Sequence, residues 1–170
     1  MTTIHAPEPR SAIEAAGNLP DAELDIAAVA LQLARVDAPD ADWRQVAAHF
    51  SDIARSVVEA ATLDSKADKG DLEARRLILA EALHGRFGYQ GDSETYDDMA
   101  NANLIRVVER RRGLPVALGI LWLHAADAAG WAAYGVDFPG HFLLALEGPR
   151  GKLIHRLYVE AAAPIKRELY

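Results

Sequence analysis

Cysteine is absent from the chain, and this one absence removes several classes of function together. Disulfide bonds, thiolate metal sites and thiol nucleophiles all need a cysteine sulfur. Any reaction that passes through a protein-bound thioester is therefore excluded. A chain without cysteine is also compatible with a reducing compartment, and we expect a cytoplasmic protein.

Long apolar runs and an excess of positive charge are missing as well. No segment approaches the ~18 apolar residues that a membrane span needs. The N-terminal region lacks the apolar core of a secretory signal. Acidic residues outnumber basic ones, 25 to 18, whereas domains that bind nucleic acids usually carry a basic face. We therefore expect neither a membrane nor a nucleic acid as a partner.

The sequence also lacks the motifs that mark common metal, cofactor and nucleophile sites. His84, His124 and His155 do not have the spacing of a helical zinc motif, so we expect no metal. The glycines between residues 85 and 91 follow a predicted helix rather than a strand, which is the wrong context for a phosphate-binding loop. No serine lies in a nucleophile elbow. We expect no cofactor.

Helical periodicity dominates most of the chain. Residues 1–19 contain prolines among small and polar residues, so we expect a flexible arm there, followed by a single domain over residues 20–165. Within that domain, apolar residues recur at three- and four-residue steps. Start and stop signals predict helices over residues 20–36, 42–61, 71–84, 104–112 and 115–129, with a solvated loop over 64–70.

The pattern changes after Gly130. Residues 131–137 and 141–146 have the composition and the intervening turn of an antiparallel pair, and residues 153–160 are a third candidate strand. Helices first and strands last predict an α+β fold. In this fold N-terminal helices are followed by a central helix packed on a small antiparallel sheet.

Two short segments outline a candidate site. Residues 109–115 end one helix and place Pro115 in the first turn of the next. Residues 136–144 form a strand, a Pro-Gly turn and a second strand that begins at His141. If this hairpin folds back onto the helix, His141 lies close to Pro115.

Each feature of this site also has an ordinary structural interpretation. A histidine at a strand end can present a base, but on spacing alone we favour a half-buried His141 bonded to a carbonyl. The run Arg110 to Arg112 could bind an anion. We favour a solvated helix end, where positive charge complements the helix dipole.

The chain resembles the bacterial transglutaminase-like proteins of the SirB type over roughly residues 22–147. That family carries an Arg-Arg-x-Gly-Ile-Pro element followed by Gly-Val-x-Phe-Pro-Gly-His-Phe-Leu. The matching residues here are Tyr96, Asp98, Asn101, Leu104, Val107, 109–113, Pro115, Leu118, Val136 and 138–143. The resemblance implies a transglutaminase-like fold, related to that of papain-type cysteine proteases, with a cleft at the start of the central helix.

In active members of that superfamily a cysteine opens the central helix, a histidine begins a facing strand and an aspartate lies on the next strand. The resemblance places Pro115 at the cysteine position and His141 at the histidine position. The family's Asp-Pro-Phe-x-Gly-Gly segment is missing, and residues 152–160 follow another pattern. The chain stops at Tyr170, where family members usually continue into a helical-repeat region, and the sequence leaves open whether this C-terminus is natural or truncated. Because triad members act together, these losses remove most of the rate enhancement.

These observations predict a binding or regulatory module without catalysis, which uses the old cleft for a protein, a peptide or a small ligand. The cleft would be shaped by Asp98, Asn101, Arg112, Pro115, Pro139 and Gly140, with His141 as its polar or catalytic group. We expect no thiol-dependent transglutaminase or protease activity.

Two alternatives stay open. One is a hydrolase or transferase in which His141 activates water or a substrate group directly. The other is a decayed product without activity. A nucleophile beside His141 would favour the enzyme, whereas an apolar wall there would favour binding. The sequence leaves the ligand and the oligomeric state undetermined.

Overall fold

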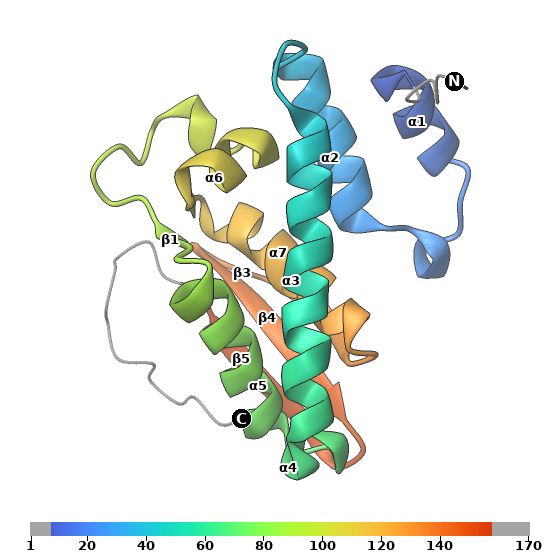
Figure 1. Ribbon diagram of the computed structural model, residues 1–170, viewed down its shortest axis with the longest axis vertical. Helices are drawn as coiled ribbons and strands as arrows, with labels where there is room; N and C mark the ends of the chain where they lie inside the picture. Colours follow the sequence, from blue (N-terminus) through green and yellow to red (C-terminus); the bar gives the residue numbers. More distant parts are fainter. Residues whose placement is uncertain (1–7, 158–170) are drawn as a thin grey trace.

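Helices precede a small sheet, as the sequence predicted (Figure 1). The computed structural model describes residues 8–157. Its helices are α1 (Pro9–Ala16), η1 (Asp21–Glu23), α2 (Ile26–Asp37), α3 (Trp43–Leu63), α4 (Ser65–Asp68), α5 (Leu72–Ala80), the π-helix η2 (Glu81–Arg86), η3 (Met99–Asn101), α6 (Leu104–Arg110) and α7 (Pro115–Ala128). Its strands are β1 (Gln90–Gly91), β2 (Arg112–Gly113), β3 (Ala132–Phe138), β4 (His141–Gly148) and β5 (Gly151–Arg156). The α+β class is confirmed.

Aspartate and asparagine side chains set where several helices begin. Asp25, Asp42 and Asp71 each accept a hydrogen bond from a backbone N–H in the first turn of α2, α3 and α5, respectively. Asn103 does the same for α6. These caps satisfy donors that have no partner inside the helix, so the helices start at the residues that follow.

The structure divides some predicted segments more finely. The predicted helix over 20–36 is two elements, because the Asp25 cap starts α2 after the separate η1 turn. The predicted loop over 64–70 contains α4, capped by Asp64. The helix predicted over 71–84 passes from α5 into the π-helix η2.

The N-terminal arm and the third strand, both predicted from the sequence, can be compared with the structure only in part. Within the predicted arm over 1–19, residues Pro9–Ala16 form α1, because Glu8 accepts hydrogen bonds from the N–H groups of Arg10 and Ser11. Helix α1 packs on α2 but buries no residue fully. The third strand was predicted to extend to residue 160, and its last part lies outside the described residues. The division into an arm and one domain stays a prediction.

Helix α7 is the central element of the core. It packs between α3 on one side and strands β3 and β4 on the other (Figure 1). Its buried residues are Ala117, Leu118, Gly119, Leu121, Trp122, Ala125 and Ala126, which share one broad side of the helix at about 100° per residue. Val116 and Asp127 lie on the remaining side and are exposed, so α7 is buried where it meets α3 and the sheet. No helix within residues 8–157 is long and apolar enough to cross a membrane.

Strand β4 approaches α7 closely at a glycine. A Cβ atom placed on Gly119 would lie 2.3 Å from Cε1 of Phe142, so the Phe142 ring occupies the space of a side chain on the helix. The ring also lies against Gly135 of β3, where an added Cβ would be 3.0 Å from it. Phe142 therefore fits between two glycines, one on α7 and one on the neighbouring strand.

The register of the sheet follows from this contact. The strand order is β3-β4-β5, and both pairs are antiparallel. Phe142, Leu144 and Leu146 point to α7, since alternate residues of a strand share a face. Their partners in the register, including Asp137 opposite Phe142 and His155 opposite Leu144, lie on that same face.

We predict that Gly119→Ala destabilises the fold by about 1–3 kcal/mol, although alanine is the better helix former. The added methyl group meets a ring that is held on its other side by Gly135. Urea unfolding of the variant measures the change. Phe142→Leu in the same chain should recover part of the loss, and a Gly119→Ala variant more stable than the parent would contradict the close approach.

Candidate functional site

Helix α7 begins at Pro115, as the sequence predicted. Leu114 is its N-cap and makes no side-chain cap bond, and Pro115 occupies the first turn, where its missing N–H costs nothing. Pro115 is half-buried. The next residue, Val116, is 45% exposed, whereas Ala117 is buried. The position that the resemblance assigns to the nucleophile is thus a proline ring beside an exposed valine.

The tip of the β3–β4 hairpin lies at the same end of α7. Phe142 packs on Gly119, which is about one helical turn beyond Pro115, and His141 directly precedes Phe142. The two-residue turn of Pro139 and Gly140 has Gly140 at φ +74°, a conformation that favours glycine. The turn, the strand start at His141 and their place near the helix start therefore agree with the sequence analysis.

The side chains at the hairpin tip divide between the two faces of the sheet. His141 pairs with Phe138 on the face opposite to Phe142, and the two rings are stacked with centroids 6.2 Å apart. Asp137 pairs with Phe142 on the face toward α7. Alternation thus directs Asp137, not His141, to the helix side. That His141 reaches Pro115 stays a prediction.

The sequence analysis missed Asp137. Its signal was present in the alternation of the strand, which puts residues 137 and 142 on one face. Which face meets α7 could not be read from the sequence, because this depends on the fit of Phe142 against Gly119.

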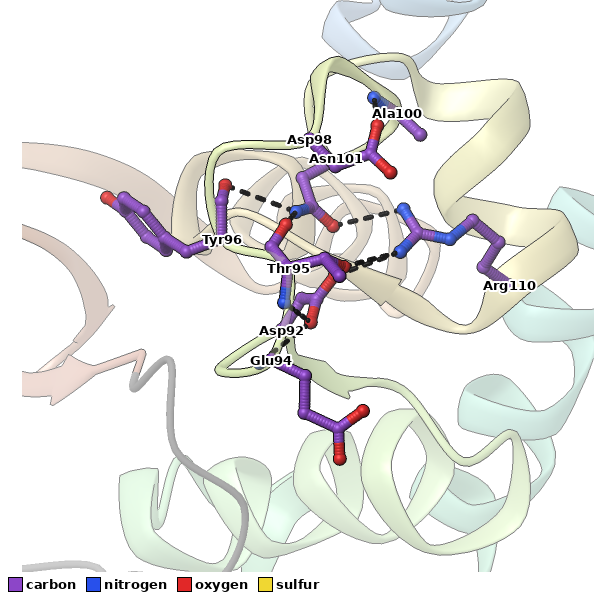
Figure 2. Close-up of polar contacts among 8 residues, drawn as sticks. All are labelled: Asp92, Glu94, Thr95, Tyr96, Asp98, Ala100, Asn101 and Arg110. Atoms are coloured by element: carbon purple, nitrogen blue, oxygen red, sulfur yellow. Dashed lines mark hydrogen bonds and ion pairs between the residues drawn. The ribbon is translucent and has the colours of Figure 1, made fainter.

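Asn101 lies at the centre of a buried polar network beside the start of α7 (Figure 2). Its Nδ2 donates to the carbonyl oxygens of Thr95 at 2.7 Å and Tyr96 at 3.2 Å. Its Oδ1 accepts from Nη1 of Arg110 at 3.2 Å. Its own carbonyl oxygen accepts the N–H of Leu114 at 3.0 Å. Asn101 therefore ties the preceding loop to the residue that caps α7.

Asp92 completes the network. Its carboxylate accepts from the N–H groups of Glu94 and Thr95, from the Thr95 hydroxyl, and from Nη2 of Arg110 at 2.9 Å. The hydrogen bonds from Thr95, with those from Asn101 and Arg110, hold the pKa of Asp92 well below its usual range. Figure 2 shows the Tyr96 ring turned away from these contacts, and it is exposed.

The other predicted cleft residues lie around this network without joining it. Asp98 is exposed and accepts from the N–H of Ala100 at 2.9 Å, which caps η3. Arg112 is half-buried in β2, where it pairs with Gln90 of β1. Pro139 and Gly140 are exposed at the hairpin tip. Of the predicted set, Asn101 is the residue that the structure connects directly to the entry of α7.

Arg111 anchors a second cluster. It ends α6 with a left-handed backbone conformation, φ +59°. Its Nη1 donates to Nε2 of His49, and it also donates to Oη of Tyr89, where the distance is 2.7 Å. Burial, and then the Arg111 charge, lower the pKa of His49 to about 4, and burial raises the pKa of Tyr89 to about 12. The interpretation of residues 110–112 as a solvated helix end is therefore wrong for Arg110 and Arg111, whose guanidinium groups bind buried partners.

Two further histidines are fixed around Trp122 of α7. Nε2 of His84 accepts the indole N–H of Trp122 at 3.1 Å, so its Nδ1 carries the proton and donates to the carbonyl of Tyr89 at 2.6 Å. His155 stacks on Trp122, with centroids 4.5 Å apart. Burial first, then Arg76 and His84, lower the pKa of His155 to about 4. These histidines are neutral parts of the core rather than exposed bases.

His141 differs from these histidines in exposure and in partners. It is exposed, and its side chain makes no hydrogen bond to another residue within 8–157. A catalytic imidazole needs a group that fixes its tautomer and direction. The geometry therefore gives His141 access to solvent but no orienting partner among the described residues.

We predict that Asn101→Leu lowers the free energy of unfolding by about 2–5 kcal/mol, because two carbonyl groups and Arg110 lose a buried partner. Hydrogen exchange at the Leu114 amide should also accelerate. Asn18→Leu is the control, since Asn18 is exposed and should change stability by less than ~0.5 kcal/mol. Equal effects of the two variants would contradict the role of the network.

Acid should destabilise the protein through His155. The unfolded state binds a proton near pH ~6.5 and the folded state only near pH 4, so stability is complete above the first value and falls as the pH drops toward the second. Between pH ~7 and pH ~5 this histidine should cost about 2 kcal/mol. Urea unfolding of His155→Phe, which keeps the stacking, should show a loss smaller by that amount, and identical pH dependences would contradict the assignment.

Comparison with known proteins identifies the family. Residues 44–163 match the family profile described as the transglutaminase-like superfamily. A UPF0162 protein of Xylella fastidiosa strain Temecula1 is 33% identical over 135 residues, which cover 79% of this chain and 46% of that protein. A UPF0162 protein of Vibrio cholerae is 38% identical over 76 residues, 45% of this chain and 28% of that protein. Human F-box only protein 21 is 29% identical over 94 residues, 53% of this chain and 14% of that protein.

No solved structure matches the chain. The chain spans less than half the length of these relatives. The matched profile covers most of the described fold, including α7 and the hairpin that packs on it. The chain therefore belongs to the transglutaminase-like superfamily.

Proposed function

We propose that the chain is a SirB-type member of this superfamily and acts in the cytoplasm as a non-catalytic binding module. It would hold a segment of another protein at the start of α7. The lack of a nucleophile supports this proposal, since Pro115 stands where active members of the superfamily have cysteine, and the chain contains no cysteine. Thiol-based acyl transfer has no chemical route here.

The observation that carries the proposal is the apolar character of the surface around His141. The ring stacked on His141 is that of Phe138, which is 53% exposed. Val116, at the start of α7, is exposed as well. Phe138 lies on the hairpin face away from α7, so it and Val116 are two exposed apolar side chains at the same end of the unit. Exposed apolar surface can mark a site that binds another molecule. The imidazole of His141, on the same face as Phe138, would orient the ligand.

Occurrence of the unit in larger proteins supports a modular role. The matched region forms 14% of human F-box only protein 21 and 46% of the Xylella relative. In those proteins the unit accompanies other parts of the chain, and such an arrangement is compatible with a recognition role.

The alternative function is hydrolysis by water that His141 activates directly. The exposure of His141 favours it, because a general base must reach its substrate. Without an orienting group or an acyl-enzyme step, such a reaction would be slow and insensitive to thiol-alkylating reagents.

The test uses a short blocked peptide with a central glutamine between leucines as its probe. Added to the isotope-labelled protein, the peptide should shift the amide signals of Val116, Ala117, Phe138 and His141 without releasing ammonia. Val116→Glu and Phe138→Ser should each weaken binding about tenfold, because the apolar contact surface is lost. Leu63→Ser is the matched control, since Leu63 is 89% exposed at the end of α3.

Two results would contradict the proposal. Ammonia release that survives alkylation and disappears in His141→Ala would support the hydrolase instead. Equal binding by the parent and both surface variants would remove the start of α7 as the binding site.

A further inference from the structure

A groove lies at the other end of α7, away from the surface proposed above. Its volume is about 330 Å³, which is near the lower end of the range of volumes found for ligand-binding pockets. One wall is the segment from η1 into α2, and another is the C-terminal half of α7, including Leu123 and Asp127. The third wall is β3, at residues 133–135. Figure 1 shows the turn before α2 and the C-terminal end of α7 on the same side of the molecule.

Strand β3 presents unused backbone groups to this groove. It is an edge strand, because the order is β3-β4-β5. The two-residue turn makes Phe138 and His141 a hydrogen-bonded pair, and such pairs alternate with non-bonded ones along the strand. The N–H and C=O groups of Ala133, Gly135 and Asp137 therefore point outward. No residue within 8–157 forms a backbone hydrogen bond with them across that edge.

An unprotected edge of this kind is unusual. Proteins normally blunt a free edge with lysines, prolines, bulges or a covering segment. Strand β3 spans seven residues, has a single charged residue, Asp137, and is exposed along most of its length. The edge is therefore ready to pair with another extended chain.

The charged carboxylate side chains that line the groove have no basic counterpart among its described lining residues. Glu23, Asp25 and Asp127 line it, and none of its described lining residues is lysine or arginine. Asp25 also caps α2, which offsets the positive end of that helix. Asp127 lies in the last turn of α7, where a negative charge opposes the helix dipole and so gains nothing for the helix. Leu24, Ile26 and Leu123 add apolar surface between the acids.

We propose that an extended peptide segment rich in basic residues binds this groove as a fourth strand paired to β3. Its backbone would pair with the outward groups of Ala133 and Gly135, and its basic side chains would meet Glu23 and Asp127. Strand addition draws affinity from main-chain bonds and selectivity from side-chain pockets. The nearby Tyr134 already holds a cation, since Nζ of Lys152 lies 5.8 Å from its ring centroid on the outer face.

A second copy of this chain fits the groove less well. Pairing two β3 edges would bring two sets of the same carboxylates together, and the chain carries a net charge of -7. Like charges across an interface oppose association. A basic partner removes this repulsion and is therefore the favoured occupant.

The probe is a blocked peptide of alternating lysine and valine with as many residues as the seven of β3. It should bind the full chain and shift the amide signals of Ala133 and Gly135. The same peptide with glutamate in place of lysine should not bind. Methylation of the backbone nitrogens on the peptide edge that faces β3 should abolish binding, whereas methylation on its other edge should not.

Two kinds of variant separate the backbone from the charges. Ala133→Pro removes an outward N–H without breaking the β3–β4 ladder, and should weaken binding about tenfold. Glu23→Gln with Asp127→Asn leaves the backbone intact and should weaken binding and its salt dependence. Asp40→Asn with Glu59→Gln is the matched control, because it changes the same charge at exposed positions outside the groove.

Several results would overturn the proposal. Equal binding by a folded Ala133→Pro variant would exclude the β3 edge, and equal binding of the glutamate peptide would exclude charge selection. A concentration-dependent dimer that Ala133→Pro dissolves would make a second copy the occupant. Strong protection of the Ala133 and Gly135 amides from hydrogen exchange in the monomer would show that the chain covers its own edge.

Discussion

The packing of Phe142 against Gly119 is the constraint on which the sheet and the candidate site depend. Because α7 has no side chain at this position, the aromatic ring reaches its backbone and strand β4 lies directly on the helix. This contact brings the start of β4 to within about one turn of Pro115. It also determines which side chains of the sheet face α7. Asp137 pairs with Phe142 and His155 pairs with Leu144, so both lie on the face that the Phe142 ring turns toward the helix.

Polar side chains then fix the chain where it enters α7. Arg110 and Arg111 are adjacent, yet the left-handed backbone at Arg111 turns them toward different partners. Arg110 joins Asp92 and Asn101, whereas Arg111 joins His49 and Tyr89. Asp92 and Asn101 are buried in the first network, and His49 and Tyr89 are buried in the second, so a lost partner would leave buried groups unpaired. The guanidinium groups of Arg110 and Arg111 therefore hold together the segments that precede α7 rather than lying free in solvent.

The sequence was sufficient to predict most helices and strands, but not which side chains meet when these elements pack together. The apolar period of α3, the proline start of α7 and the Pro-Gly turn before His141 are local signals, and each predicted its element. The partners of Arg110 and Arg111 are up to 62 positions away in sequence, and no local pattern reveals them. The face of His141 was equally hidden, because a strand has two faces and packing alone distinguishes them.

The position of the hairpin on α7 is the central claim of this account, and proton–proton contacts measured by NMR test it most directly. Contacts should appear between the Phe142 ring and the α-protons of Gly119, and between the His141 and Phe138 rings. A shift of one residue in the strand would exchange the two faces. Contacts from His141 to Gly119, with Phe142 on the outer face, would contradict the register and the description of the site built on it.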